Sequence, residues 1–337
     1  MFNSMSKLLF IFLLILSTFI CISANSWLGA WIGLEMNLLS FIPLMNDNKN
    51  SLSNEASLKY FLTQALGSIF LLFSICINFI NLNYFSMIFF NNIYLLMINS
   101  SLLLKIGAAP FHFWFPSILN SMNWMNSMLL MTWQKINPFI CLSYCFNMKF
   151  IVMISLLSIM VGSLGGLNST SMRKIMAFSS ISHIGWMLMG ILISDSIFLF
   201  YFLFYSFISI SLIISFNYLK LFYMNQLLSN SLLSKTKFSI FITLLSMGGL
   251  PPFLGFLPKW VMIESLIKMN LLIVSLIMVM MTMITLYFYL RLAFSSMMFN
   301  NFPMYWKYLD KKTPIKIFIL NYFSMMFFPI FIALFMI

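Results

Sequence analysis

Long apolar segments follow one another along almost the whole of this 337-residue chain, with only short polar stretches between them. A helix needs about 20 apolar residues to cross the roughly 30 Å hydrocarbon core of a bilayer. Hydrophobic residues make up 62% of the chain and charged residues only 7%, too few to cover the surface of a water-soluble protein. The sequence therefore predicts an all-α polytopic membrane protein, with residues 1–337 in a single membrane domain.

We predict about eleven transmembrane helices, because that many apolar segments are long enough to cross the bilayer. The first segment follows Lys7 and resembles a signal peptide. We interpret it as a membrane span, since the next apolar segment begins almost immediately, at Trp27, and no globular domain that would need export follows. The predicted limits are 5–23, 26–45, 57–80, 87–110, 123–146, 150–168, 173–193, 196–221, 238–267, 270–297 and 316–336.

When the basic residues other than Lys105, Lys135 and Lys259 are assigned to alternate sides of this arrangement, most fall on one side of the membrane. Only Lys149 and Lys268 fall on the other side. Such a bias is typical of the cytoplasmic or mitochondrial matrix side, so we expect the amino terminus there and, with an odd number of spans, the carboxy terminus opposite. The residues on the amino-terminal side are Lys7, Lys49, Lys59, Arg173, Lys174, Lys220, Lys235, Lys237, Arg291, Lys307, Lys311, Lys312 and Lys316.

Four charged residues stand out inside the predicted spans: Glu35, Lys105, Lys135 and Lys259. On insertion scales a Lys, Arg or Asp at the centre of a membrane helix costs roughly 2.5 to 3.5 kcal/mol, and such residues normally face a bundle interior or a water path. They therefore predict a route for cations or protons. For Glu35 and Lys105 the alternative is a static ion pair that only fixes helix packing. Glu264 is the other acidic residue in a predicted span.

Two of the predicted spans are interrupted by glycine and proline. The fourth span contains segment 104–114, and the ninth contains segment 246–260, with three prolines and three glycines. Such breaks free backbone groups that lipid cannot satisfy, so they must line protein or water. Lys105 lies beside one break and Lys259 beside the other.

The order of the spans predicts two inverted repeats of about five helices each, with discontinuous helices at corresponding positions. The first repeat would occupy residues 5–147 and the second 150–298, followed by a loop and the last transmembrane helix in 299–337. Because each repeat has an odd number of helices, the second starts on the opposite side of the membrane. Interrupted helices in inverted repeats indicate an ion site near the membrane midplane.

Lys135 lies about twelve residues into the fifth predicted span, about 18 Å along a helix axis and therefore near the bilayer centre. Pro138 has no backbone N–H, and we expect it to disturb the preceding turn and to provide polar surroundings for the ammonium group. His183 shares a helix face with Ser179, four residues earlier. Because imidazole titrates near neutral pH, both a proton relay and a hydrogen-bonded packing role remain open for His183.

The sequence contains no nucleotide loop, flavin fingerprint, catalytic triad or metal-binding cluster. We therefore expect no redox catalysis, no cofactor site and no metal site in this chain. The basic residues are scattered singly, which argues against nucleic acid as a partner. The cysteines, whose spacing suits neither zinc nor an iron–sulfur cluster, are expected to be reduced packing residues; they are Cys21, Cys76, Cys141 and Cys145.

Segments distributed over almost the whole chain share one family pattern: 26–35, 55–61, 105–114, 133–138, 165–168, 173–180 and 248–260. They resemble the antiporter-like membrane-arm subunits of mitochondrial NADH:ubiquinone oxidoreductase, respiratory complex I, in an arthropod-like version. The resemblance implies a proton-translocation channel in which Glu35 and Lys105 form a pair and Lys135 is the central lysine. It further implies that Lys259 leads to the exit and that His183 lies in the region of the relay histidine.

The resemblance also implies where the other components are. NADH, FMN, iron–sulfur clusters and ubiquinone would be used in other subunits of the complex. The expected partners are those subunits, especially the adjacent antiporter-like subunit 4 and the small subunit 4L, together with lipids such as cardiolipin, and protons. The expected location is the mitochondrial inner membrane, with the amino terminus on the matrix side and the carboxy terminus in the intermembrane space.

The chain departs from the wider family in two respects. We find no counterpart of the family's first three spans and no long carboxy-terminal lateral helix. The alternative function is a free-standing cation/proton antiporter subunit, which would use the same lysines. The missing spans disfavour it, because the remaining fold would need neighbouring subunits to cover its exposed side. A third reading is an inert membrane spacer, in which removal of charge would affect assembly but not proton pumping.

Overall fold

The computed structural model describes residues 5–46, 50–83, 88–228, 234–298 and 321. All regular elements in these residues are helices, apart from one isolated bridge between Ser171 and Tyr223. The expected all-α class is thereby confirmed for the described residues. The chain divides into two compact units, Met1–Leu157 and Ser158–Ile337, so that the division falls within α8 (Met148–Leu167).

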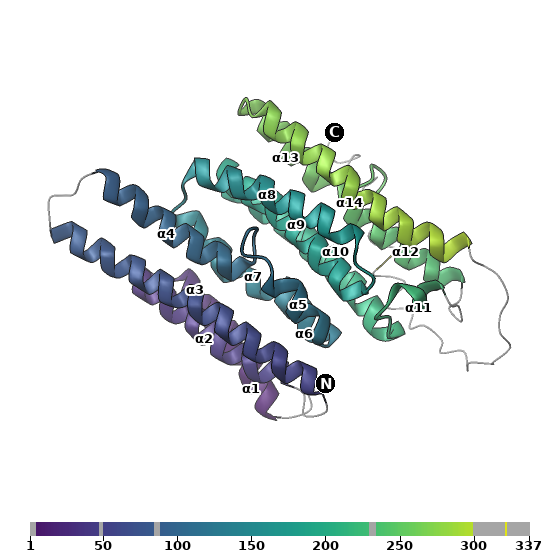
Figure 1. The fold of residues 1–337 in the computed structure, drawn as a ribbon, viewed down its shortest axis with the longest axis horizontal. Coiled ribbons are helices and arrows are strands. Elements are labelled where there is room, and N and C mark those ends of the chain that lie inside the picture. The colour runs from purple at the N-terminus through teal and green to yellow at the C-terminus, as the bar shows by residue number, and fades with distance from the viewer. Residues whose placement is uncertain (1–4, 47–49, 84–87, 229–233, 299–320, 322–337) are drawn as a thin grey trace. The chain divides into compact units, whose positions relative to one another are not determined.

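In the first unit α1, α2 and α3 pack side by side, and α4 packs against α3 (Figure 1). The short helix α7 contacts α1, α2 and α4. The bounds are α1 (Met5–Ile22), α2 (Trp27–Met45), α3 (Ser51–Asn83), α4 (Ile88–Ile106), α5 (Trp114–Ser121), α6 (Trp124–Met131) and α7 (Trp133–Tyr144).

In the second unit α9 lies innermost, since 94% of its most apolar window is buried. It packs against α10 and α13, while α12 packs between α10 and α14. The bounds are α9 (Met172–Ile193), α10 (Asp195–Leu219), α11 (Met224–Leu228), α12 (Ser234–Gly248), α13 (Phe256–Lys268) and α14 (Leu272–Met298).

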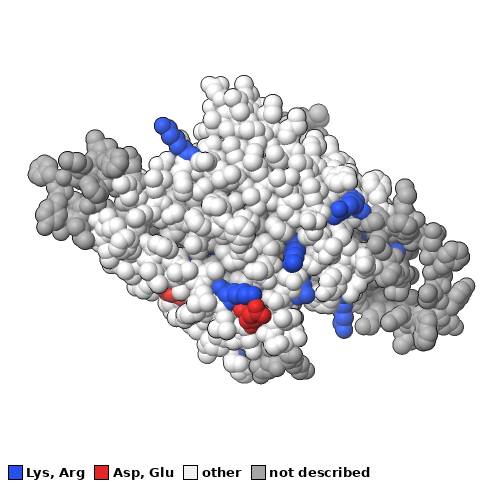
Figure 2. Space-filling view, viewed as in Figure 1, with Lys and Arg blue, Asp and Glu red and all other residues white. Residues whose placement is uncertain are grey.

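Among the described residues, 7 helices are long and apolar enough to cross a membrane: α1, α2, α3, α8, α9, α10 and α14. Each begins and ends within a few residues of a predicted span, except that α3 starts earlier, at Ser51. Glu55, in the added residues, forms an exposed ion pair with Lys59, inside the predicted span. The face drawn in Figure 2 is mostly uncharged, as expected of a surface that contacts lipid.

The other predicted spans consist of shorter pieces. Span 87–110 contains α4, and the chain continues beyond its break as α5, which the prediction missed. Span 238–267 contains α12 and α13, with the expected break between them. Span 316–336 lies outside the described residues apart from Asn321.

The fifth predicted span is also interrupted, but not where we predicted. Pro138 lies inside α7, which continues through it, and the break between α6 and α7 is at Thr132, with φ −112° and ψ −72°. The Thr132 hydroxyl donates to the carbonyl of Met128 at 2.8 Å. Pro138 is tolerated because it deprives only the carbonyl of Gln134, near the start of α7, of an intrahelical donor.

Glycines allow several helices to approach closely. A Cβ atom on Gly162 of α8 would lie 2.5 Å from the backbone nitrogen of Ser182 in α9. A Cβ atom on Gly255, just before α13, would lie 1.7 Å from the carbonyl oxygen of Ser246 in α12. Small residues that bring backbones together are a common basis of helix packing in membranes. The second break in particular requires glycine at position 255.

We expect Gly255→Ala to destabilise the second unit by about 1 to 3 kcal/mol or more, because the added methyl group must push α12 and α13 apart. Gly248→Ala is the matched control, since its added Cβ atom would lie 3.5 Å from the nearest atom, in Tyr289. The measurement is the thermal unfolding midpoint and the amount of each variant retained in membranes. Equal values for the two variants would contradict the packing argument.

Candidate functional site

The helix α4 ends at a glycine in the left-handed region. Gly107 has φ 81°. Its N–H donates a hydrogen bond to the carbonyl of Leu103 at 3.0 Å, and the N–H of Ala108 donates to the same carbonyl at 3.1 Å. This pattern ends an α-helix and leaves its last carbonyl groups open to other donors. A side chain would be strained at this φ, so glycine suits the position.

The helix α12 ends in the same way. Gly249 has φ 82°. Its N–H donates a hydrogen bond to the carbonyl of Leu245 at 3.0 Å, and the N–H of Leu250 donates to the same carbonyl at 3.5 Å. The two breaks therefore share a local backbone geometry. The Gly and Pro content predicted where the helices are interrupted but not how they end.

The two breaks also share a sequence spacing that our sequence analysis missed. Proline follows Gly107 by three and by nine residues, at Pro110 and Pro116. Proline follows Gly249 at the same intervals. In each case the later proline lies in the first turn of the next helix, α5 or α13, where a missing N–H costs no intrahelical bond. Aligning the two glycines would have revealed this match.

Lys105 and Lys259 lie on opposite sides of their breaks. Lys105 is in the last turn of α4 and precedes its glycine, whereas Lys259 is in α13 and follows its glycine. Both side chains are buried, with 6% and 7% of their surface exposed. The two lysines are therefore not equivalent positions, although each is beside an interrupted helix.

In the first unit, neighbouring side chains satisfy the open carbonyl groups at the end of α4. The Gln64 amide of α3 donates to the backbone carbonyl of Lys105 at 3.2 Å, and the Trp114 indole of α5 donates to Leu104 at 3.1 Å. These bonds place polar groups around the Lys105 backbone and fix the end of α4 against α3 and α5.

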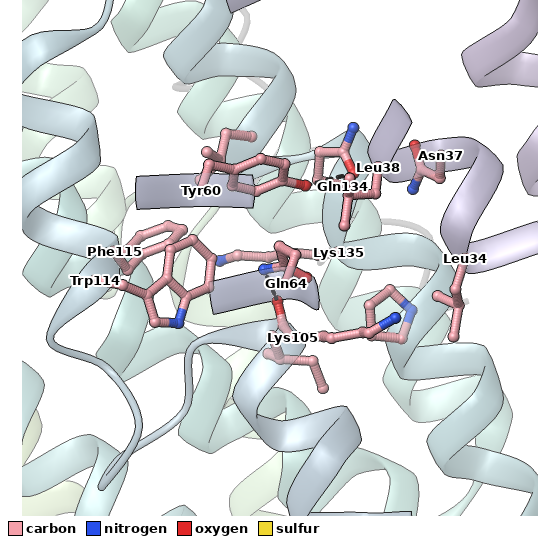
Figure 3. A pocket seen from close by; sticks show the side chains of 13 residues that line it. Leu34, Asn37, Leu38, Tyr60, Gln64, Lys105, Trp114, Phe115, Gln134 and Lys135 are labelled. Atoms are coloured by element: carbon pink, nitrogen blue, oxygen red, sulfur yellow. Dashed lines mark hydrogen bonds between the residues drawn. The ribbon is translucent and has the colours of Figure 1, made fainter. Parts of the chain in front are cut away.

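Lys105 and Lys135 line one small pocket in this unit. Lys135 is the third residue of α7 and is 2% exposed, and its Nζ atom lies 5.5 Å from the ring centroid of Phe115. Figure 3 shows the Lys135 side chain extending toward Phe115 and Trp114, whereas the Lys105 side chain extends toward Leu34 of α2. The pocket therefore brings together two of the predicted residues.

Other polar side chains line the same pocket. The Tyr60 hydroxyl of α3 donates to the Gln134 amide oxygen of α7 at 3.3 Å. The Oδ1 atom of Asn37 and the Nε2 atom of Gln134 are buried without a protein hydrogen-bond partner. Sequence analysis missed these residues. A usable signal was the spacing of four between Tyr60 and Gln64, which puts two polar groups on one face of an apolar helix.

Glu35 lies on α2 and is partly buried. Within the described part of the chain, it forms no direct ion pair with Lys105, and its Oε1 atom has no hydrogen-bond partner. Its helix neighbours Leu34 and Asn37 line the pocket, so Glu35 lies at the edge of the site. Glu35 is nevertheless near enough to Lys105 for the two charges to attract each other. Glu264, by contrast, pairs with Lys268 at 2.8 Å on an exposed face of α13.

In the second unit, Lys259 of α13 forms a hydrogen bond with the end of α12. Its Nζ atom donates to the carbonyl of Gly248 at 2.7 Å. A Cβ atom on Gly249 would lie 2.9 Å from the same Nζ atom, so the glycine leaves space for the ammonium group. A positive charge at the carboxyl end of a helix is favourable, because it satisfies an open carbonyl and complements the helix dipole.

His183 lies in α9 and is 7% exposed. Its Nδ1 atom is 2.8 Å from the Tyr201 hydroxyl of α10, and its ring centroid is 5.0 Å from that of Tyr205. These three residues line a second small pocket together with Gly255 and Pro258 at the start of α13. His183 is thus hydrogen-bonded and also faces the interrupted helix, so the geometry is compatible with both predicted roles.

In the residues that the structure describes, no group of three or more His, Cys, Asp or Glu side chains could hold a metal ion. The chemistry that the two sites can perform is the gain and loss of protons at lysine, histidine and tyrosine. No redox group is needed for that chemistry.

Residues 24–285 match the family described as "NADH:quinone oxidoreductase/Mrp antiporter, TM". NADH-ubiquinone oxidoreductase chain 2 of Anopheles gambiae is 53% identical over 301 residues, which cover 88% of this chain and 88% of that protein. The protein of the same name from Locusta migratoria is 47% identical over 298 residues, with coverage of 88% and 86%.

Solved structures show the same fold. A chain of respiratory complex I from Thermus thermophilus superposes with a TM-score of 0.80 at 22% identity, over 87% of this chain and 71% of that chain. A chain of the Mrp complex from Dietzia sp. superposes with a TM-score of 0.75 at 16% identity, over 85% and 59%. The resemblance noted in the sequence is confirmed, and the chain belongs to the NADH:quinone oxidoreductase/Mrp antiporter transmembrane family.

Proposed function

We propose that this chain is a membrane-arm subunit of the proton-pumping NADH:ubiquinone oxidoreductase, respiratory complex I, and that it provides a proton-translocation channel. The names of relatives at 53% and 47% identity support membership in that complex. The observation that carries the channel is the shared pocket of Lys105 and Lys135, two buried lysines on different helices. Charge buried in a membrane subunit normally serves transport.

In the first unit, protons pass between Lys105 and Lys135 through the pocket. The two ammonium groups extend in different directions, so water and polar side chains must bridge them (Figure 3). Buried polar groups without a protein partner normally bind water, and Asn37 and Gln134 provide such groups in the pocket. Repulsion between two ammonium groups in a medium of low dielectric constant disfavours both being charged at once. Charging one lysine therefore promotes proton release from the other.

Glu35 sets the charge at the edge of this pocket. Without a direct ion pair, its carboxylate attracts the Lys105 ammonium to an extent that depends on the hydration between them. Electron transfer in other subunits, which use NADH, FMN, iron–sulfur clusters and ubiquinone, would alter the charge or hydration around Glu35 and Lys105. That change shifts the proton affinity of Lys135. This chain itself performs no redox catalysis.

In the second unit, Lys259 receives a proton or passes it on toward the exit. Its bond to Gly248 holds the ammonium beside the open end of α12. His183 and Tyr201 form a hydrogen-bonded pair whose two groups can each donate and accept a proton, and they face the same interrupted helix. These contacts support a relay role for His183.

The membership that we propose also determines location and partners. The chain lies in the mitochondrial inner membrane as a multi-pass subunit, with the amino terminus on the matrix side, as the distribution of basic residues favours. Its neighbours are other subunits of the complex, including the antiporter-like subunit 4 and the small subunit 4L, and lipids such as cardiolipin. Large exposed apolar side chains on α1 and α3, such as Phe12 and Leu62, are available for such contacts.

The test of the channel is Lys135→Met in the assembled complex. Methionine preserves the approximate volume of the side chain but cannot carry a proton. We expect the complex to assemble and proton pumping driven by NADH to fall by at least about tenfold, a modest figure for the loss of a positioned proton-transfer group. The matched control is Lys149→Met, which removes an exposed charge at the start of α8. Unchanged turnover and unchanged protons per NADH in Lys135→Met would refute the channel.

Lys259 allows a test that separates charge from structure. Lys259→Gln removes the charge but retains an N–H donor for the Gly248 carbonyl, whereas Lys259→Met removes both. We expect normal assembly with impaired pumping for the Gln variant, and an additional loss of thermal stability for the Met variant. The control is Lys268→Gln, at an exposed position on the same helix. If the Gln variant pumps normally, Lys259 only stabilises the break.

A further inference from the structure

Two cysteine thiols face each other inside the first unit. Cys21 of α1 and Cys141 of α7 are both 0% exposed, and their sulfur atoms are 3.3 Å apart. They are separated by 120 positions in the sequence, so their spacing predicted only two unrelated packing residues. The structure instead places them together as a pair of buried thiols.

The surrounding contacts hold the two thiols in this arrangement. A Cβ atom on Gly33 of α2 would lie 2.9 Å from the backbone of Cys21, so α1 and α2 approach closely at that point. Next to Cys21, the carbonyl of Ile22 accepts a hydrogen bond from the Tyr144 hydroxyl of α7 at 3.3 Å. The helices α1 and α7 are therefore joined by a second contact close to the sulfur atoms.

The lysine pocket comes close to the two thiols. Pro138 lines the pocket and lies three residues before Cys141, on the same face of α7. Leu34 lines it from α2, next to the glycine that packs on Cys21. The pocket therefore extends to within about one helical turn of the pair on two of its helices.

We propose that Cys21 and Cys141 form a reversible oxidation site, at which hydrogen peroxide closes a disulfide between α1 and α7. The sulfur atoms of a disulfide are about 2.05 Å apart, so the two sulfur atoms must approach by about 1.2 Å from the observed distance. Hydrogen peroxide is small and uncharged, which suits a site inside a membrane protein.

The reaction has two steps. The sulfur of one cysteine attacks a peroxide oxygen, the O–O bond breaks, and a sulfenic acid and one water are formed. The second sulfur then attacks the sulfenic sulfur, the S–S bond forms, the S–O bond breaks, and the second water leaves. Two thiols and one peroxide thus give one disulfide and two waters. The two sulfur atoms lose two electrons, and the two thiol protons end in water.

The disulfide would tie α1 to the helix that carries Lys135. Cys141 follows Lys135 by six residues, about 9 Å along α7. Any shift of α7 during proton transfer would then be restricted by α1. This consequence rests on the proposed function, whereas the oxidation site itself does not.

The test uses the intact complex in native membranes. Samples are treated with hydrogen peroxide, with or without a subsequent phosphine reductant, then denatured, alkylated with N-ethylmaleimide, digested and examined by mass spectrometry. We expect peptides containing Cys21 and Cys141 to become linked, both thiols to lose alkylation together, and the reductant to restore it. Cys76, which is exposed, and Cys145, which lies four residues after Cys141, are internal controls.

If solvent access rather than pairing decided oxidation, the more exposed Cys76 and Cys145 would react while Cys21 and Cys141 remained alkylated. That result would overturn the proposal, as would a link from either cysteine to a different thiol. Protons pumped per NADH are measured in the same samples. Pumping that falls with the linked fraction and recovers on reduction supports the restriction of α7. Linkage with unchanged pumping retains the oxidation site and refutes only that restriction.

Discussion

The open carbonyl groups at the ends of α4 and α12 determine how the rest of each site is built. Lipid offers no hydrogen-bond donors, so an interrupted helix is possible only where protein or water provides them. In the first unit Gln64 and Trp114 provide donors for the end of α4, and in the second unit Lys259 provides one for the end of α12. The same groups make the interior polar enough for charge. In the second unit the interrupted helix and the buried lysine therefore depend on each other, because Lys259 itself donates the hydrogen bond that the open carbonyl group of Gly248 needs.

This dependence accounts for the different surroundings of the lysines. Lys259 has a fixed carbonyl partner, which favours holding the ammonium in one place. Lys105 and Lys135 share a pocket with amide groups that have no protein partner, which favours exchange with water. A subunit that moves protons needs both kinds of position: some that hold a charge and some that let it leave. In the thiol pair of Cys21 and Cys141, Cys141 lies about one helical turn along α7 from Pro138, which lines this pocket.

The sequence predicted the membrane class, the limits of the long helices and the two breaks, because apolar length and clusters of Gly and Pro are local signals. The break at Thr132 was missed, since threonine is common inside helices and the nearby Pro138 was the stronger signal. The bonds of Tyr60 to Gln134 and of His183 to Tyr201, like the contact between Cys21 and Cys141, join different helices. Such contacts depend on how each helix is rotated about its axis and on the angle at which two helices cross. Neither quantity can be deduced from the residues of one helix alone. The shared spacing of proline after Gly107 and Gly249 was available in the sequence and could have been found.

The proposed coupling to electron transfer requires that this chain works inside an NADH-oxidising assembly. The direct measurement is to solubilise native membranes in mild detergent, separate the complexes on a native gel, and locate this chain by mass spectrometry. We predict that it migrates in a very large band that oxidises NADH and contains other subunits of the same complex. If the chain is found instead in a small band without that activity, it functions as a free-standing cation/proton antiporter, and the proposed coupling to electron transfer is wrong.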